Sequence, residues 1–329
     1  MPRNLMTDVP GVRVGHAGDQ RLASGVTAVV FDEAAVASVD VRGGGPGTRE
    51  TDLLDPAMTV DAIDAITLSG GSAFGLDAAS GVAAYLREQG RGYAVRTTRV
   101  PIVPGAILFD LLNSGDKHWD RYPPYRELAY AAAAAAASDF ALGSVGAGLG
   151  ATLVDLKGGI GSASATYEGT TIGALAAVNA AGAVTVGDGP HFWAAPFEND
   201  HEFGGRGFPT SLPTAALVPR TKGSVGASTT LVVVATDVAL TKPQAKRVAV
   251  MAQVGLARAI FPVHTPLDGD VLFVVSTGKR PLADSVLGLM RLGTVAANVV
   301  ARAIARGVYE ATALPSFGSL PGYRDKFGA

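Results

Sequence analysis

The chain has no cysteine among its 329 residues. This absence excludes disulfides, thiolate metal sites and a cysteine nucleophile, and it fits a reducing compartment. Runs of basic residues are also absent, and the formal net charge is −2. Nucleic-acid binding needs a positive field that such a chain does not provide. We therefore expect no nucleic-acid partner.

The sequence shows no targeting or membrane segment. The first residues, MPRNLMTDVPGVRVGH, contain no apolar stretch of signal-peptide length. No run approaches the roughly 20 apolar residues of a membrane helix. The five histidines lack metal-ligand spacing, and no phosphate-binding glycine loop is present. We expect a cytoplasmic protein with no membrane partner, metal or cofactor.

Glycine and apolar residues are abundant. The 42 glycines are nearly twice the usual share of about 7%. Hydrophobic residues make up 48% of the chain and charged residues 17%, so a large core is easily filled. A prior of roughly 150 residues per domain allows two domains or one large domain. Alternating strand and helix patterns favour the α/β (α+β) class.

The patterns predict the following elements. Strands are expected at 25–32, 34–41, 65–68, 229–240 and 271–277, with two more around a turn within 171–187. Helices are expected at 75–90, 130–142, 241–259 and 285–310. The polar, Gly- and Pro-rich segment from about 190 to 228 is predicted to be a linker.

Thr229 lies where this polar linker meets the most apolar strand of the chain. A strand that begins Thr-Thr is ordinary, because threonine is a good β-former. A catalytic interpretation is that Thr229 attacks the carbonyl of Ser228, so that an N→O acyl shift and chain cleavage follow. The freed α-amine, whose unperturbed pKa is about 7.7–8.0, then serves as general base for the threonine hydroxyl.

Asp268 and Asp270 flank Gly269 just before an apolar strand. Turn formation alone explains an Asp-Gly pair. The spacing of two residues also allows both carboxylates to lie on one face of the strand. One of them would then accept a hydrogen bond from Thr229 or from its ammonium group.

Seven segments resemble one known family, the self-processing L-aminopeptidase/D-esterase family, which includes β-aminopeptidases and nylon-oligomer hydrolases. They are TDVPGVRVGH (7–16), VRGGGPGTRETDLLDP (41–56), LSGGSAFGLDAASGV (68–82), VPIVPGAILFDL (100–111), KGGIGSAS (157–164), AAVNAAG (176–182) and STTLVVVATD (228–237). The resemblance implies an N-terminal-nucleophile-hydrolase-like αββα sandwich. It implies one catalytic domain over 1–329 that cleaves itself into 1–228 and 229–329. It also implies a homo-oligomer, a tetramer or larger, of processed chains.

The resemblance assigns further site residues. Asn179 matches the asparagine that helps to form the family's oxyanion hole. Lys157, with Asp155 as the alternative, lies near the position of an active-site lysine in the nylon-hydrolase branch. Phe74 stands where that branch has a tyrosine. Gly71 and Ser72 belong to a turn that could present N–H groups to substrate. Ser228 replaces the asparagine that often precedes the nucleophile, and it is an alternative nucleophile.

The expected activity is hydrolysis by an autoprocessing N-terminal-threonine enzyme. Its substrates would be small peptides, amino-acid amides or esters that release their N-terminal residue. The alternatives are endo-type hydrolysis of 6-aminohexanoate (nylon) oligomers and an unprocessed, non-catalytic binding protein.

Overall fold

The computed structural model describes residues 2–222, 228–315 and 318–328. Within them, nine strands form one sheet in the order β3-β7-β4-β2-β11-β10-β9-β8, with β1 beside β2. The strands of this sheet are β1 (Val12–Asp19), β2 (Ser24–Val41), β3 (Thr48–Arg49), β4 (Ala62–Ser69), β7 (Gly105–Ile107), β8 (Gly159–Tyr167), β9 (Thr170–Asn179), β10 (Thr229–Val238) and β11 (Val271–Arg280). A separate hairpin consists of β5 (Tyr93–Val95) and β6 (Thr98–Val100).

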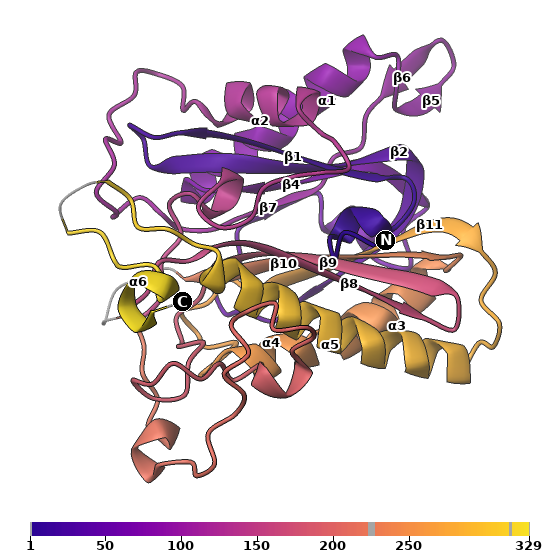
Figure 1. The fold of residues 1–329 in the computed structure, drawn as a ribbon. Helices are drawn as coiled ribbons and strands as arrows, with labels where there is room; N and C mark the ends of the chain where they lie inside the picture. The colour runs from indigo at the N-terminus through magenta and orange to yellow at the C-terminus, as the bar shows by residue number, and fades with distance from the viewer. Residues whose placement is uncertain (1, 223–227, 316–317, 329) are drawn as a thin grey trace.

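The helices flank this sheet on two sides (Figure 1). The α-helices are α1 (Ala78–Glu88), α2 (Tyr125–Ala134), α3 (Lys242–Ala252), α4 (Val254–Ala259), α5 (Leu287–Tyr309) and α6 (Tyr323–Phe327). The short 3₁₀ helices are η1 (Met6–Asp8), η2 (Asp52–Leu54), η3 (Ser72–Asp77), η4 (Gly146–Gly148), η5 (Ala195–Phe197) and η6 (Thr214–Leu217).

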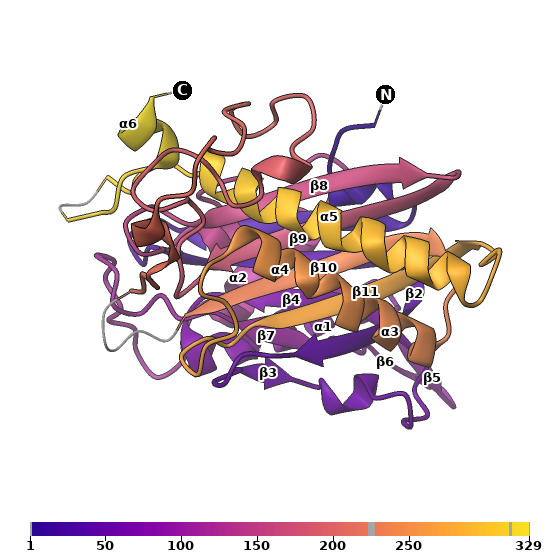
Figure 2. The ribbon, with the colours of Figure 1, turned by 90° about the horizontal axis from the view of Figure 1, so that it is seen from below.

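Three buried apolar clusters define an αββα layering. One cluster lies between α1 and α2 and the strands β1, β2 and β4. The strands themselves form two layers, with β1, β2 and β4 in one and β8–β11 in the other, and a second cluster lies between these layers. A third cluster lies between β8–β11 and the helices α3, α4 and α5, which cross these strands in Figure 2. Strand β10 serves both of the latter, because successive side chains of a strand point to opposite faces. Its Leu231 and Val233 belong to the middle cluster, whereas Val232 and Val234 pack towards the helices.

Strand β2 corrects one prediction. The sequence predicted two strands, 25–32 and 34–41, but a single strand of 18 residues runs from Ser24 to Val41. Its pairing with β4 shifts register between Val30 and Ala35, and residues 32–34 are exposed. An irregularity of this kind bends a strand without ending it. The bend therefore lets one strand pair with both β4 and β11.

The segment 171–187 also differs from its prediction. Only one strand, β9, is found there, and its hairpin partner is β8 across the turn at Glu168 and Gly169. Both turn residues have positive φ, 49° and 76°, as tight hairpins require. The neighbouring strand β10 begins at Thr229, opposite the last residue of β9. Strand β9 therefore ends at Asn179, opposite the residue at which β10 begins.

The remaining helix predictions hold with adjusted bounds. Thr241 caps α3 by accepting a hydrogen bond from the N–H of Gln244, as the sequence predicted. The predicted helix 241–259 is divided into α3 and α4, and the predicted helix 75–90 begins with a 3₁₀ turn. The Ala-rich helix is α2, which ends at Ala134 because Ala137 then pairs with Val14 of β1.

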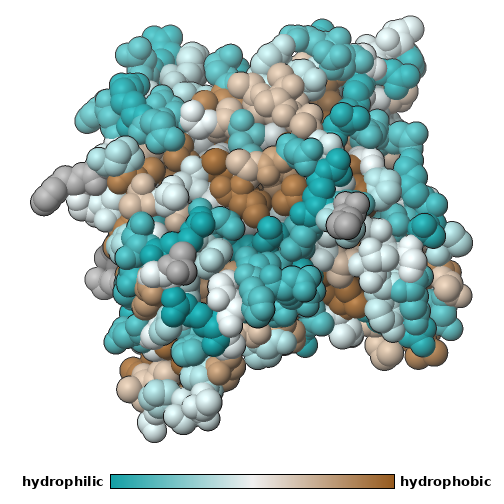
Figure 3. Space-filling view, viewed as in Figure 1, coloured by the Kyte–Doolittle hydropathy of each residue, from teal (hydrophilic) through white to brown (hydrophobic). Residues whose placement is uncertain are grey.

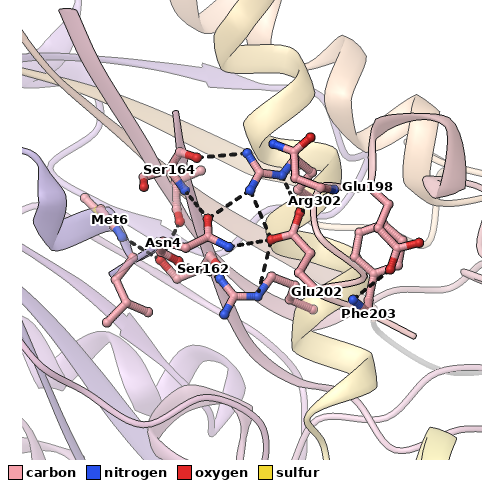
Figure 4. Close-up of polar contacts among 12 residues, drawn as sticks. Asn4, Met6, Ser162, Ser164, Glu198, Glu202, Phe203 and Arg302 are labelled. Carbon is pink, nitrogen blue, oxygen red and sulfur yellow. Dashed lines mark hydrogen bonds and ion pairs between the residues drawn. The ribbon is translucent and has the colours of Figure 1, made fainter. Parts of the chain in front are cut away.

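The predicted linker at 190–228 has no strand in its described part, and residues 223–227 lie outside the described residues. It is nevertheless well anchored, because the rings of Phe192 and Phe203 are buried in the third cluster. Glu202 pairs with Arg302 of α5, and both side chains are almost fully buried. Figure 4 shows this pair beside Asn4 and Ser164, which connect it to the N-terminal segment and to β8.

Helix α5 corrects the statement that no run approaches the length of a membrane span. Its 23 residues are long and apolar enough to cross a membrane by length and composition. In this fold the helix packs against β8 and β9, and 13 of its residues are buried. Polar residues cover most of the face seen in Figure 3, with apolar residues gathered between the α1–α2 layer and α5. The buried apolar residues of α5 are therefore part of the protein core.

Candidate active site

Thr229 is the first residue of β10 and is 3% exposed. On one side it pairs with Asn179, the last residue of the antiparallel strand β9. On the other side β11 runs parallel to β10, and the turn that contains Asp268, Gly269 and Asp270 directly precedes β11. The sheet therefore brings together the residues that the sequence grouped around Thr229.

The bond between Ser228 and Thr229 lies against this turn. The N–H of Ser228 donates to the carbonyl of Leu267 at 3.1 Å, and the N–H of Gly269 donates to the carbonyl of Ser228 at 2.6 Å. A Cβ added at Gly269 would lie 2.6 Å from Oγ1 of Thr229 and 2.8 Å from the carbonyl oxygen of Gly45. Only glycine fits between the threonine hydroxyl and the neighbouring backbone.

Asp270 is buried behind Thr229. Its Oδ1 accepts a hydrogen bond from the N–H of Thr230 at 2.8 Å, and its Oδ2 lies 2.9 Å from Nδ1 of His264. The sequence predicted a bond from Thr229 to one of the two aspartates. In the uncleaved chain the donor to Asp270 is instead the next residue, because successive N–H groups of a strand point to opposite neighbours.

Asp268 is held by a different set of donors. Its Oδ1 accepts from the N–H of Ala181 at 3.1 Å. Its Oδ2 accepts from the N–H of Thr265 at 2.9 Å and from the Thr265 hydroxyl at 2.6 Å. Burial, and then the charge of Asp270, raises the pKa of Asp268. These bonds join the turn before β11 to the segment that follows β9.

Asn179 is fully buried, and its side-chain amide is held on both sides. Its Oδ1 accepts from the N–H of Thr152 at 3.0 Å and from Nζ of Lys222 at 2.9 Å. Its Nδ2 donates one hydrogen to the carbonyl of Phe109 at 3.0 Å. An amide nitrogen has two hydrogens, so a second donor is available beside Thr229.

Lys222 is a site residue that the sequence reasoning missed. It belongs to the linker, and its own N–H donates to the carbonyl of Ala181 at 3.0 Å. Burial lowers the pKa of Lys222 to about 7, against the opposing effect of Asp268 and Asp110. Its sequence neighbours are polar and lack periodicity. No local pattern therefore indicates that its amine is directed inward.

Lys157 is 1% exposed and lies near Lys222. Its Nζ donates to the carbonyls of Gly148 and Gly158 at 2.9 and 2.7 Å. Burial lowers the pKa of Lys157 to about 7. Its described hydrogen bonds thus connect it to the glycine-rich backbone, with none to Thr229. Asp155, the alternative, instead pairs with Arg220 and Lys326 in partly exposed ion pairs.

A cavity of about 320 Å³ opens next to these residues. Lys157, Lys222 and Thr152 line it, and the last two also bond to Asn179. The other described residues that line it are Phe109, Asp110, Leu112, Asn113, Ser114, Gly150, Leu314, Gly318, Ser319 and Leu320. The cavity therefore approaches Thr229 through Asn179.

The structure does not bring Phe74 to this cavity. Its ring is half exposed and meets the ring of Trp119 edge-on at 5.3 Å. Residue 74 lies in η3, on the side of the sheet that α1 and α2 cover. The aromatic residue that lines the cavity is Phe109.

The turn at Gly71 and Ser72 has another role than the one predicted. The N–H of Gly71 donates to Oδ1 of Asp110 at 2.8 Å, and the N–H of Ser72 donates to the carbonyl of Leu108 at 3.0 Å. A Cβ at Gly71 would collide with the Tyr125 ring at 2.1 Å. These N–H groups are bonded within the protein, and the turn positions Asp110 instead of presenting donors to a substrate.

Known proteins resemble this chain over nearly its whole length. The profile of peptidase family S58 matches residues 4–319. An uncharacterised aminopeptidase of Mycobacterium tuberculosis is 43% identical over 350 residues, with 98% of each chain covered. A 6-aminohexanoate-oligomer endohydrolase of Agromyces sp. is 27% identical over 286 residues, which cover 84% of this chain and 76% of that protein.

A solved structure extends the comparison to the fold. The L-aminopeptidase D-Ala-esterase/amidase of Ochrobactrum anthropi, described as a variant of the Ntn-hydrolase fold, has a TM-score of 0.69 at 20% sequence identity. The similarity covers 98% of this chain and 92% of that chain. Both the resemblance and the fold class that the sequence indicated are confirmed. The chain belongs to peptidase family S58 and is an aminopeptidase of that Ntn-hydrolase family.

Proposed function

We propose that the chain cleaves itself between Ser228 and Thr229 and that the new N-terminal Thr229 is the nucleophile of an aminopeptidase. The substrates are small peptides, amino-acid amides or esters. The observation that carries the proposal is the short hydrogen bond, 2.6 Å, from the N–H of Gly269 to the carbonyl oxygen of Ser228. A donor on this oxygen stabilises the negative charge that develops there when Thr229 attacks.

Self-cleavage begins when Oγ1 of Thr229 attacks the carbonyl carbon of Ser228. The C–N bond then breaks, and the acyl group moves from the nitrogen to the oxygen of Thr229. Water hydrolyses this ester, which leaves a carboxylate on Ser228 and a free α-amine on Thr229. Asp270 stays bonded to the N–H of Thr230, so the start of β10 keeps its position during the exchange.

Hydrolysis of a substrate uses the freed amine. The amine takes the proton of the Thr229 hydroxyl, the oxygen attacks the substrate carbonyl, and the proton passes to the leaving amine. Water then releases the acyl group from Thr229. Asn179 lies opposite Thr229, and its second amide hydrogen suits it to donate to the oxyanion. Asp268 and Asp270 provide negative charge that stabilises the ammonium form while the amine holds the proton taken from the Thr229 hydroxyl.

The test is the substitution Thr229→Ala. Purified wild-type protein is expected to give two bands on a denaturing gel, residues 1–228 and the 101 residues 229–329. Mass spectrometry of the smaller fragment should find Thr229 at its start. The variant should remain one chain and should not release p-nitroaniline from amino-acid p-nitroanilides. A variant that still splits at this bond would show that Thr229 is not the nucleophile.

Thr230→Val is a matched control. Thr230 is the next residue of β10, is fully buried, and its Oγ1 has no hydrogen-bond partner in the described chain. Valine keeps the branched shape and removes a hydroxyl that is buried without a partner among the described residues, so this variant should cleave itself and hydrolyse substrates much as wild type does. Ser228→Ala tests Ser228 as the alternative nucleophile. If Thr229 is the nucleophile, this variant should still hydrolyse substrates once the chain has been cleaved.

Endo-type hydrolysis of 6-aminohexanoate oligomers is a second candidate, favoured by the 27% identity to the Agromyces enzyme. The two activities differ in the bond that they attack. A panel of p-nitroanilides of α-, β- and ω-amino acids, run beside a blocked 6-aminohexanoate oligomer, distinguishes them. Hydrolysis of the blocked oligomer without release from any free-amine substrate would favour the endohydrolase.

The unprocessed binding protein remains a third candidate, because Ser228 stands where the resemblance suggests asparagine. One intact band after long incubation, without amidase activity, would favour it. We also propose that processed chains assemble into a homo-oligomer. Exposed apolar side chains at the start of α5, those of Val286, Leu287 and Met290, offer surface for such contacts.

A further inference from the structure

The cavity beside Asn179 contains two lysines that the proposed chemistry does not use as a nucleophile or base. Lys157 reaches it from the segment before β8, and Lys222 reaches it from the linker. An ammonium group has three hydrogens. Lys157 donates to two carbonyls, and Lys222 donates to Oδ1 and to the carbonyl of Asn179, the latter at 3.3 Å. Each amine therefore has one further hydrogen for a ligand.

The charge balance of the cavity fits a single negative charge. Asp110 is the acidic residue among the described residues that line it, against the two lysines. Two charged residues lie outside the lining. The positive charge of Lys117 acts on the pKa of Asp110, and the negative charge of Asp268 acts on the pKa of Lys222, so these neighbours add one charge of each sign. With these groups ionised, the excess is one positive charge. A doubly charged phosphate would exceed it, whereas a carboxylate matches it.

The size of the cavity points to a small ligand. About 320 Å³ is at the lower end of the roughly 300–1,000 Å³ of small-molecule pockets. Leu112, Leu314 and Leu320 supply apolar wall beside the two amines. An entering group therefore meets a charged end and an apolar side, which suits a short organic acid better than an inorganic anion.

We propose that this cavity binds a carboxylate through Lys157 and Lys222, and that this carboxylate is the free C-terminus of a short peptide substrate or of its product. The second part rests on the proposed aminopeptidase function. The amine of Lys222 donates to Asn179 and would also bind the carboxylate. The C-terminal end of the peptide would therefore lie close to the residue that pairs with Thr229. The enzyme would then prefer peptides whose carboxylate lies close to the scissile bond.

The binding test uses the uncleaved Thr229→Ala chain and isothermal titration calorimetry. Propionate is expected to bind with a millimolar Kd, whereas propionamide and inorganic phosphate bind at least fivefold more weakly. Burial lowers the pKa of both lysines to about 7, so they are charged below that pH and neutral above it. Propionate affinity should therefore fall roughly 30-fold or more from about pH 6 to about pH 8.5, because even one required amine loses that share of its charged form. Asp110, whose pKa is raised, changes the charge in the same direction because it becomes neutral as pH falls.

Two variants and a control locate the site. Lys222→Met should abolish propionate binding, and Lys157→Met should do the same if its buried amine can be lost without unfolding. Lys279→Met is the control, because Lys279 is exposed and paired with Glu33 on the surface. Equal binding of propionate and propionamide, tighter binding of phosphate, or affinity independent of pH would overturn the carboxylate site. These results come from an uncleaved chain, so they do not depend on whether Thr229 is catalytic.

A kinetic test assigns the source of the carboxylate. The processed wild-type enzyme should show a KM at least fivefold lower for a dipeptide than for the same dipeptide as its C-terminal amide. Lys222→Met should raise the KM of the dipeptide more than that of the amide, so that the ratio of the two KM values approaches one. Equal KM values in wild type, together with propionate binding, would reject the substrate assignment and leave a site for a separate organic acid. If neither compound is hydrolysed and the chain stays whole, the proposed function itself fails.

Discussion

At the scale of single residues, Gly269 decides whether Thr229 can be both buried and reactive. Its N–H donates a hydrogen bond to the carbonyl oxygen of Ser228, and its Cα lies next to the Thr229 hydroxyl, where any Cβ would project. A Cβ at residue 269 would lie 2.6 Å from that hydroxyl oxygen, too close for both to keep their positions. The glycine between the two aspartates thus has a role beyond turn formation.

Gly269→Ala is therefore expected to slow self-cleavage by about 100-fold or more. The new Cβ would lie 2.6 Å from Oγ1 of Thr229 and must displace it, and misplacement of a reacting group by about 1 Å can cost 10²-fold in rate. The rate is measured as loss of the full-length band on denaturing gels. Gly45→Ala is the control, because a Cβ there would meet the carbonyl of Asp268 at an ordinary 3.9 Å. Cleavage of the Gly269 variant as fast as the control would refute this steric argument.

At the scale of elements, the linker is held to the last long helix by a buried ion pair. Arg302 of α5 donates to Glu202 and also to the carbonyl of Ser164 at 2.8 Å and to Oδ1 of Asn4 at 2.9 Å (Figure 4). The Arg302 and Glu202 side chains are 5% and 6% exposed. The first part of the linker is thereby fixed between α5 and the N-terminal segment.

Arg302→Met should lower the free energy of unfolding by about 3 kcal/mol, because the buried Glu202 carboxylate loses its closest partner and keeps only Arg306, at 3.6 Å, as an ion-pair partner among the described residues. Urea unfolding of the Thr229→Ala chain measures this, since that chain does not divide. Arg302→Met combined with Glu202→Met should be less destabilised than Arg302→Met alone, because the buried carboxylate that lost its closest partner is removed as well. The control is Arg13→Met, whose pair with Asp32 is exposed and screened by solvent and should contribute far less to stability than the buried pair. Similar losses for Arg13→Met and Arg302→Met would contradict the role of burial.

At the scale of the whole molecule, the proposed cleavage divides the sheet between two chains. Residues 229–329 provide β10 and β11, which lie between β9 and β2 of the other fragment. Helices α3, α4 and α5 from the same fragment cover that part of the sheet. Breaking one peptide bond at the start of β10 leaves the ladders on both of its sides intact.

The two fragments should consequently stay together in native buffer. Gel filtration of the processed enzyme is expected to give one species that contains both fragments in equal amounts. The fragments should separate only in denaturant. Elution of a free fragment of 101 residues under native conditions would show that the sheet does not hold them.

The sequence by itself determined the features that depend on neighbouring residues. The apolar strand after Thr229, the capping of α3 by Thr241 and the Asp-Gly-Asp turn are local patterns, and the resemblance rests on continuous segments. The prediction of two strands at 25–41 failed because pairing with β4 and β11, which are distant in the sequence, carries one strand through the bend.

Only the tertiary structure decided which groups meet around Thr229. Lys222 reaches Asn179, and Phe109 lines the cavity whereas Phe74, predicted to bind substrate, contacts Trp119 away from it. Asp270 accepts its bond from Thr230 instead of Thr229. Local periodicity indicates which face a side chain occupies on its own element. The distance between two side chains, and the burial that shifts a lysine pKa, depend on how segments far apart in the chain pack together.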